Sequence, residues 1–199
     1  MSVIAPAFAD PGLASQSVFR TVMQAMARPA TIARLASGVA APAPLRSAAA
    51  AIALTLLDYE TPVWLDAALA QAPDVTAWIS FHTGAPRTDD PQQAAFAFLA
   101  EPELALAFDQ FALGSDEFPD SSTTVVLQVE QMIAGAGIPF AGPGIAETQA
   151  LHAAPLPSDF QGRLIANRNL FPRGIDLLLA TDVEIAALPR SLRVIGEGG

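Results

Sequence analysis

The stretch TTVVLQVE, residues 123–130, is the clearest strand of the sequence and the starting point for its fold. It is a short apolar run rich in β-branched residues, which is typical of a buried strand. The residues that follow, MIAGAGIPFAGPGIAE, contain Gly135–Gly137, which can turn the chain, and IPFAG, which can return beside the first strand. We therefore predict a β-hairpin over this part of the chain.

The glycines of this stretch also have the spacing of a phosphate-binding loop. Gly137 and Gly142 are separated as in G-x-x-x-x-G, and a strand precedes them. Such a loop needs Lys and then Ser or Thr after the second glycine, whereas Pro143 and Gly144 stand there. A G-x-G-x-x-G pattern fails too, because Phe140 occupies its third glycine position. Turn formation is therefore the expected role of these glycines.

Apolar strands and helices alternate along the rest of the chain. We expect strands at residues 61–66, 96–100, 175–180 and 183–190, and helices at residues 17–29, 47–58, 75–82, 103–111 and 159–169. Ser17, Asp74 and Asp159 are the expected N-caps of three of these helices. The alternation, interrupted by a hairpin, indicates one α/β domain over residues 1–199, with a mixed sheet and helices on both faces in a three-layer α-β-α sandwich.

The composition limits the compartment and the partners. The net charge is −10, so a phosphodiester backbone would be repelled and nucleic acid is not expected as a partner. There is no Cys, which excludes disulfides and thiolate metal sites. The first residues lack the features of a signal peptide, and the most apolar segment, residues 48–57, is too short to span a bilayer. We expect a soluble, cytoplasmic protein without membrane contact.

All ten basic residues are Arg, and this absence of Lys removes whole mechanisms. A Schiff base to a cofactor or a carbonyl substrate requires a Lys amine, so covalent pyridoxal phosphate chemistry is excluded. The two histidines, His82 and His152, cannot build a three-His metal centre. We therefore expect neither a cofactor nor a metal site.

The positive charge is concentrated at the C-terminal end. Residues 1–157 hold five Arg and fifteen acidic residues, whereas residues 158–199 hold five of each. The five C-terminal arginines are Arg163, Arg168, Arg173, Arg190 and Arg193. The favoured interpretation is that they form salt bridges and helix-end contacts, and the alternative is a surface that faces an anion or a partner.

Six segments, taken together, resemble one family, the H subunit of the bacterial carbon–phosphorus lyase core complex (the PhnH family of phosphonate metabolism). They are FRTVMQAMARP at 19–29, TPVWL at 61–65, FHTGAP at 81–86, GPGIAE at 142–147, FPRGID at 171–176 and LPR at 188–190. They occur in the order expected for the family and extend from near one terminus to near the other. Ala30 departs from the Gly expected after Pro29, and Arg173 stands where another member carries Leu.

The resemblance implies a fold similar to the large domain of the pyridoxal-phosphate-dependent transferases, without the cofactor. It also implies a homodimer that joins G, I and J subunits in a larger assembly. With these partners, the system displaces adenine from ATP by a phosphonate, giving ribose 1-phosphonate 5-triphosphate, and a radical iron–sulfur step on the J subunit later breaks the carbon–phosphorus bond. The nucleosidase chemistry is usually assigned to the I subunit, so the resemblance implies an accessory role for the H subunit.

All five candidate site residues lie in the matching segments, and the first two are Glu147 and His82. Glu147 is the charged group of GPGIAE and could orient an Arg or a ribose hydroxyl, although a solvated or paired carboxylate is the default. His82, in FHTGAP, is a possible proton carrier, although a lone His is more often a hydrogen-bonded structural residue.

The remaining candidates are Asp176, Arg190 and Arg20. Asp176 opens an apolar strand, where a carboxylate is costly unless it is paired, and Arg190 and Arg20 are its expected partners. A buried pair that joins strand ends is the favoured interpretation, and anion binding beside the pair is the alternative.

Two hypotheses of function follow. The chain is either an architectural subunit that binds partners and carries no catalytic residue of its own, or a subunit whose dimer cleft binds ATP or a phosphonate and contributes to the transferase site.

Overall fold

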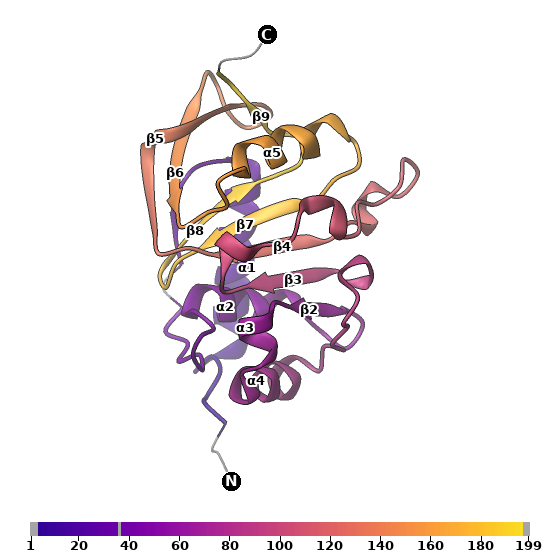
Figure 1. Ribbon diagram of the computed structural model, residues 1–199. Coiled ribbons are helices and arrows are strands. Elements are labelled where there is room, and N and C mark those ends of the chain that lie inside the picture. Colours follow the sequence, from indigo (N-terminus) through magenta and orange to yellow (C-terminus); the bar gives the residue numbers. More distant parts are fainter. Residues whose placement is uncertain (1–3, 36, 197–199) are drawn as a thin grey trace.

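Six strands form the main sheet of the computed structural model, which describes residues 4–35 and 37–196 (Figure 1). Their order is β1-β8-β7-β4-β3-β2. The bounds are β1 Ala33–Arg34, β2 Val63–Leu65, β3 Phe96–Leu99, β4 Thr124–Gln128, β7 Asp176–Ala180 and β8 Glu184–Leu188. Strands β2, β3, β4 and β7 are parallel, whereas β8 and β1 are antiparallel to their neighbours. The predictions of an α/β fold and a mixed sheet are confirmed.

A second sheet of three strands lies beside the main one, in the order β6-β5-β9. Its strands are β5 Gln131–Ala141, β6 Gln149–Ala154 and β9 Arg193–Val194. The predicted hairpin between residues 123–130 and 138–142 is therefore wrong. The segment 138–141 is part of β5 and pairs with β6 and β9, and Gly135–Gly137 form a bulge inside β5 where the register shifts. The true hairpin joins β5 to β6, and GPGIAE lies in its turn.

The described residues form five α-helices: α1 Pro11–Ala27, α2 Ser47–Leu56, α3 Ala67–Ala70, α4 Pro73–Thr83 and α5 Phe160–Asn169. Helix α1 begins earlier than predicted, because the N-cap is Asp10, whose carboxylate accepts from the Leu13 amide at 3.2 Å, and not Ser17. Helix α4 likewise begins at Pro73, so Asp74 lies in its first turn. Asp159 is the N-cap residue of α5, as expected. Within the described ranges, no helix is long and apolar enough to cross a membrane.

The predicted helix over residues 103–111 is wrong. The chain forms two 3-10 turns instead, Pro102–Leu104 and Phe108–Gln110. The carbonyls of Ala105 and Leu106 accept hydrogen bonds from Arg163 at 2.8 and 3.0 Å. These carbonyls would be used within a continuous helix, so the contact with α5 replaces the helical pattern.

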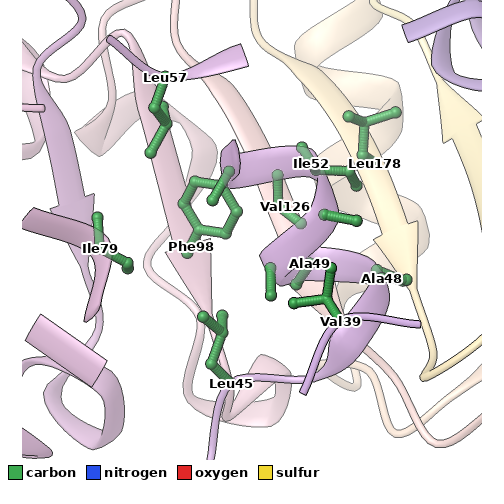
Figure 2. Packing of buried hydrophobic residues seen from close by; sticks show 14 of the residues in the cluster. Val39, Leu45, Ala48, Ala49, Ile52, Leu57, Ile79, Phe98, Val126 and Leu178 are labelled. Atoms are coloured by element: carbon green, nitrogen blue, oxygen red, sulfur yellow. The ribbon is translucent and has the colours of Figure 1, made fainter. Parts of the chain in front are cut away.

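The main sheet separates two apolar cores. In β7, Leu178 and Ala180 belong to the first core, whereas Leu177 and Leu179 belong to the second. The first core is covered by α1, α2 and α4, and Figure 2 shows Phe98, Val126 and Leu178 of three strands beside α2. The second core is covered by α5 together with the second sheet. The predicted three-layer sandwich therefore left out the small sheet on this face.

Candidate functional site

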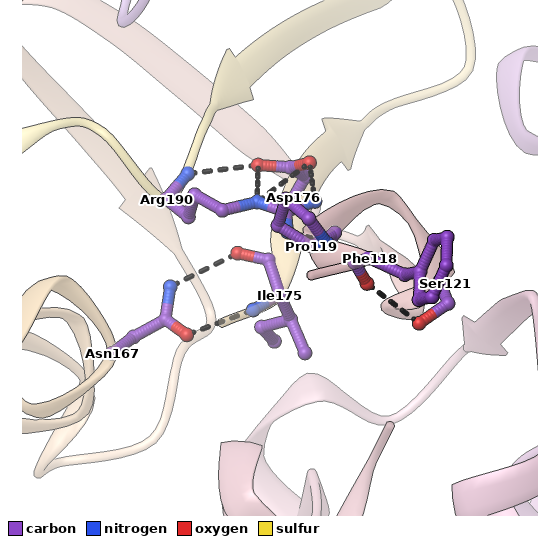
Figure 3. Close-up of polar contacts among 7 residues, drawn as sticks. All are labelled: Phe118, Pro119, Ser121, Asn167, Ile175, Asp176 and Arg190. Atoms are coloured by element: carbon purple, nitrogen blue, oxygen red, sulfur yellow. Dashed lines mark hydrogen bonds and ion pairs between the residues drawn. The ribbon is translucent and has the colours of Figure 1, made fainter. Parts of the chain in front are cut away.

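A largely buried ion pair joins Asp176, at the start of β7, to Arg190, which follows the end of β8 (Figure 3). Arg190 donates from Nη2 to Asp176 Oδ2 at 2.5 Å and from Nε to both carboxylate oxygens at 3.2 Å. Its backbone amide donates to Asp176 Oδ1 at 2.8 Å. Each side chain is only 15% exposed. The predicted pairing of Asp176 with Arg190 is therefore present, whereas Arg20 lies exposed on α1 and takes no part in it.

The same arginine holds the acidic loop at residues 113–122. Arg190 Nη1 donates to the carbonyl of Pro119, which lies in the 3-10 helix Pro119–Ser121. The guanidinium therefore neutralises a buried carboxylate and fixes a neighbouring loop with one side chain.

Asn167, in α5, binds the backbone of Ile175, the residue before Asp176. Its side-chain amide donates to the Ile175 carbonyl at 2.9 Å, and its oxygen accepts from the Ile175 amide at 2.9 Å (Figure 3). The chain passes so closely that a Cβ on Gly174, whose φ is +117°, would lie 2.7 Å from Asn167 Oδ1. Asn167 was not predicted as a site residue. The signal available in the sequence was its position near the end of a predicted helix, shortly before FPRG.

His82 has a structural contact. Its Nε2 lies 3.0 Å from the Ala5 carbonyl, which also accepts from Trp78 Nε1 at 2.9 Å. The His82 ring packs edge-on against Trp78, with 4.9 Å between the ring centroids. His82 and Trp78 attach the N-terminal segment to α4, on the face of the main sheet that holds the first core.

Glu147 is exposed and lines a shallow groove of about 310 Å³ between the end of α1 and the β5–β6 turn. Thr31, Thr148 and Gln149 supply its other polar side chains. Position 144 in this turn requires glycine, because its φ is +83° and a Cβ would lie 2.2 Å from the Ala27 carbonyl oxygen. The turn can therefore pack directly on the end of α1.

Ala30, after the same helix, has a φ of +58°. This is a left-handed conformation that favours glycine, which accounts for the Gly expected at this position from the family resemblance.

Two polar residues at the carboxyl ends of strands were not predicted. Asp66, directly after β2, accepts from the amides of Leu69, Ala100 and Glu101 at 2.7–3.0 Å. Gln128, the last residue of β4, accepts from the Arg46 amide at 2.5 Å and donates to the Pro44 carbonyl at 3.1 Å. A polar residue within or directly after a buried strand was the available signal for both. Their hydrogen bonds go to backbone groups, so both side chains act in folding.

Two exposed carboxyl groups, those of Asp58 and Asp159, have lowered pKa values. The Thr61 hydroxyl lowers the pKa of Asp58, and the Arg163 guanidinium lowers the pKa of Asp159. In the part of the chain that the structure describes, no three acidic, His or Cys side chains gather in a group that could hold a metal ion.

A larger hollow, of about 350 Å³, lies between β2 and α4. Its lining residues are Val63, Leu65, Thr76, Ile79, Ser80, Ala85 and Arg87. We call it the β2 hollow. Arg87 is the charged residue of its lining, and it is exposed to solvent.

Comparison with known proteins gives the family. Residues 6–195 match the family described as "Bacterial phosphonate metabolism protein (PhnH)". The chain is 46% identical over 188 residues, 94% of each chain, to the α-D-ribose 1-methylphosphonate 5-triphosphate synthase subunit PhnH of Rhizobium meliloti. It is 30% identical over 182 residues, 90% of this chain and 85% of the other, to a putative C-P lyase subunit protein HtxG of Stutzerimonas stutzeri. The chain belongs to the PhnH family.

The six segments that carried the resemblance lie in pairs. TPVWL and FHTGAP both contribute to the β2 hollow. The end of FRTVMQAMARP and GPGIAE line the Glu147 groove. FPRGID and LPR meet in the Asp176–Arg190 pair. The candidates Arg20, His82 and Glu147 therefore do not join Asp176 and Arg190 in one site.

Proposed function

We propose that this chain is an accessory subunit of the carbon–phosphorus lyase core complex, supporting the displacement of adenine from ATP by a phosphonate. The observation that carries the proposal is the 46% identity, over 94% of both chains, to a protein named as a subunit of ribose 1-methylphosphonate 5-triphosphate synthase. The product named there contains a phosphonate at ribose C1 and a triphosphate at C5, as expected for this reaction.

The geometry of the candidate residues supports an accessory role. Asp176 and Arg190 bind each other and a loop carbonyl. His82 binds the Ala5 carbonyl. Displacing adenine needs an acid for the leaving base and a nucleophile held in place, and such groups act only when positioned together. The contacts of these residues instead join distant parts of the chain.

The proposed setting is a homodimer that assembles with G, I and J subunits in the cytoplasm. Exposed apolar side chains on α1, Phe19 at 49% and Met23 at 44%, are available for such association. The fold is proposed to resemble the large domain of the pyridoxal-phosphate-dependent transferases. The chain has no Lys to hold that cofactor covalently, so we expect no imine absorbance band after incubation with pyridoxal phosphate and gel filtration. Sedimentation at micromolar concentration tests the dimer.

The central experiment measures adenine release from ATP and methylphosphonate. The purified chain alone should release none, and the complex reconstituted without it should lose turnover. The complex carrying His82→Ala should assemble and retain turnover if His82 is structural. Adenine release by this chain alone would refute the accessory role, and so would full turnover of the complex that lacks it.

A second candidate function is direct binding of ATP or a phosphonate. The β2 hollow favours it, because an exposed guanidinium and two hydroxyl side chains lie together there.

A further inference from the structure

The β2 hollow lies at the open edge of the main sheet. Strand β2 is the last strand on this side, and its outer edge is covered only in part by residues 86–88. The Val63 amide donates to the Pro86 carbonyl at 2.9 Å, and the Thr88 amide donates to the Val63 carbonyl at 3.0 Å. Asp90 then starts a 3-10 helix, Pro91–Gln93, so this cover ends before it reaches Leu65.

The backbone of Leu65 is therefore available in the hollow. The Asp66 amide donates to the Phe98 carbonyl of β3 at 3.1 Å. Neighbouring residues of a strand direct their amides to opposite sides, so the Leu65 amide points away from β3, toward the uncovered edge. This amide is a donor in the lining of the hollow, to which α4 contributes Thr76 and Ser80.

The register places Arg87 on the same face as α4. Val63 and Arg87 form a parallel bridge, and residues paired in this way direct their side chains to the same side of a sheet. The Val63 side chain is buried in the core that α4 covers. Arg87 therefore stands beside Thr76 and Ser80, the hydroxyl residues that α4 contributes to the lining.

Among the residues that the structure describes, Arg87 forms no ion pair. The ion pairs of the described residues involve Arg46, Arg163, Arg173 and Arg190. None of the residues that line the hollow is acidic. The whole chain has a net charge of −10, but the lining of the hollow carries one positive and no negative side chain. An anion that enters the hollow is therefore attracted by Arg87 and is not repelled by the lining.

We infer that the β2 hollow binds the phosphonate or phosphate group of a small ligand. Arg87 offers a planar fork of donors to such an oxyanion, and Ser80 and the Leu65 amide add neutral donors. The apolar lining of Val63, Ile79 and Ala85 can contact a short alkyl group. The volume of about 350 Å³ is that of a small-molecule site. The inference deepens the second candidate function and rests on it for the identity of the oxyanion.

The experiment titrates the purified full-length chain with methylphosphonate, and separately with inorganic phosphate and acetate, while amide resonances are followed by NMR. We expect saturable shifts that include Leu65, Ser80 and Arg87. Arg87→Gln should weaken binding about 10- to 100-fold, as expected for loss of a charged hydrogen-bond donor. Arg34→Gln, an exposed arginine of the opposite edge strand, is the matched control and should leave the affinity unchanged.

The arms of the experiment separate the outcomes. Stronger binding of methylphosphonate than of phosphate would identify a site for phosphonates, and the reverse order a site for phosphate groups. Binding of acetate alone would overturn the inference and indicate a surface for an acidic side chain of a partner. Absence of saturable shifts, or equal loss in both arginine variants, would also overturn it. None of these results depends on adenine release by the complex, so the accessory role can survive failure of the site.

Discussion

Arg190 and Arg87 lie at the same end of the main sheet but in opposite surroundings. Val63, Phe96, Thr124 and Asp176 are paired in register across four parallel strands. Arg190 binds the residue at one end of this row, and Arg87 is bridged to the residue at the other end. Adjacent strands are about 4.8 Å apart, so about 14 Å separates the ends of the row.

The difference between them lies in their partners. Arg190 meets a carboxylate and a loop carbonyl and is mostly buried, whereas Arg87 is exposed beside hydroxyl groups and an uncovered strand edge. A buried charge must be paired for the fold to be stable, but an exposed charge need not be. We therefore expect Arg190 to contribute to the stability of the fold, and Arg87 not to contribute.

The largest expected effect comes from breaking the buried pair. Asp176→Ala leaves the Arg190 charge without a partner and should lower the free energy of unfolding by about 3 kcal/mol. The double variant with Arg190→Met should recover part of this loss, because the uncompensated charge is then removed. Urea denaturation measures both values. If Asp176→Ala lowers the free energy of unfolding by less than about 1 kcal/mol, the fold tolerates an unpaired Arg190, and the contrast with Arg87 is contradicted.

Two glycines with similar φ differ in the space around the position that a Cβ would occupy. Gly144, at +83°, packs against the Ala27 carbonyl, whereas Gly135, at +76°, has no atom within 4 Å of the position of a Cβ. Both Ala variants carry the left-handed strain of about 1–2 kcal/mol. Gly144→Ala should cost about 1 kcal/mol more, because the helix end must move. Equal losses in thermal or urea denaturation would show that the turn does not press on α1.

Arg87→Ala should have almost no effect on stability. The side chain is exposed and forms no ion pair with the described residues, so the free energy of unfolding should change by less than about 0.5 kcal/mol. The same denaturation series provides the measurement. A loss comparable to that of Asp176→Ala would mean that Arg87 is part of the fold and would remove the contrast with Arg190.

A small and pH-dependent effect is expected for the ion pair between Arg163 and the exposed residue Asp159. The pKa of Asp159 lies below its ordinary value of 3.8 because the Arg163 guanidinium lies 2.8 Å from its carboxylate. A lowered pKa stabilises the folded state above the ordinary value, and this contribution is lost as the pH falls through the folded pKa. Asp159→Asn should therefore be slightly less stable than the parent at pH 6, and the difference should shrink below about pH 4. A difference independent of pH would contradict the assignment.

Strands and the family could be predicted from the sequence because their signals are local. The runs VVL at residues 125–127 and LLLA at residues 177–180 are apolar for their whole length, and the structure buries them on both faces. The second sheet could not be predicted in this way. Strand β5 is exposed over much of its length and β6 is mostly half-buried, and the glycines that suggested a turn form a bulge instead. A bulge and a turn use the same residues, and pairing with distant β9 decides between them.

The candidate site was predicted in part for a similar reason. Asp176 and Arg190 stood out because a charge in an apolar strand demands a partner. Arg87 carried no such demand, since an exposed arginine is ordinary in sequence. Its significance depends on the bridge to Val63 and on the hydroxyl groups of α4, which are contacts between segments far apart in the chain.

The two cores on either side of the main sheet have a consequence for how the strands find their alignment. In a sheet with one wet face, a shift by one residue exposes apolar side chains and is prevented by that cost. In β4 and β7 the shift would only exchange one buried aliphatic side chain for another. The polar end residues Gln128 and Asp176 distinguish the registers, because a shift would move their side chains away from the backbone groups of Arg46, Pro44 and Arg190 that they bind.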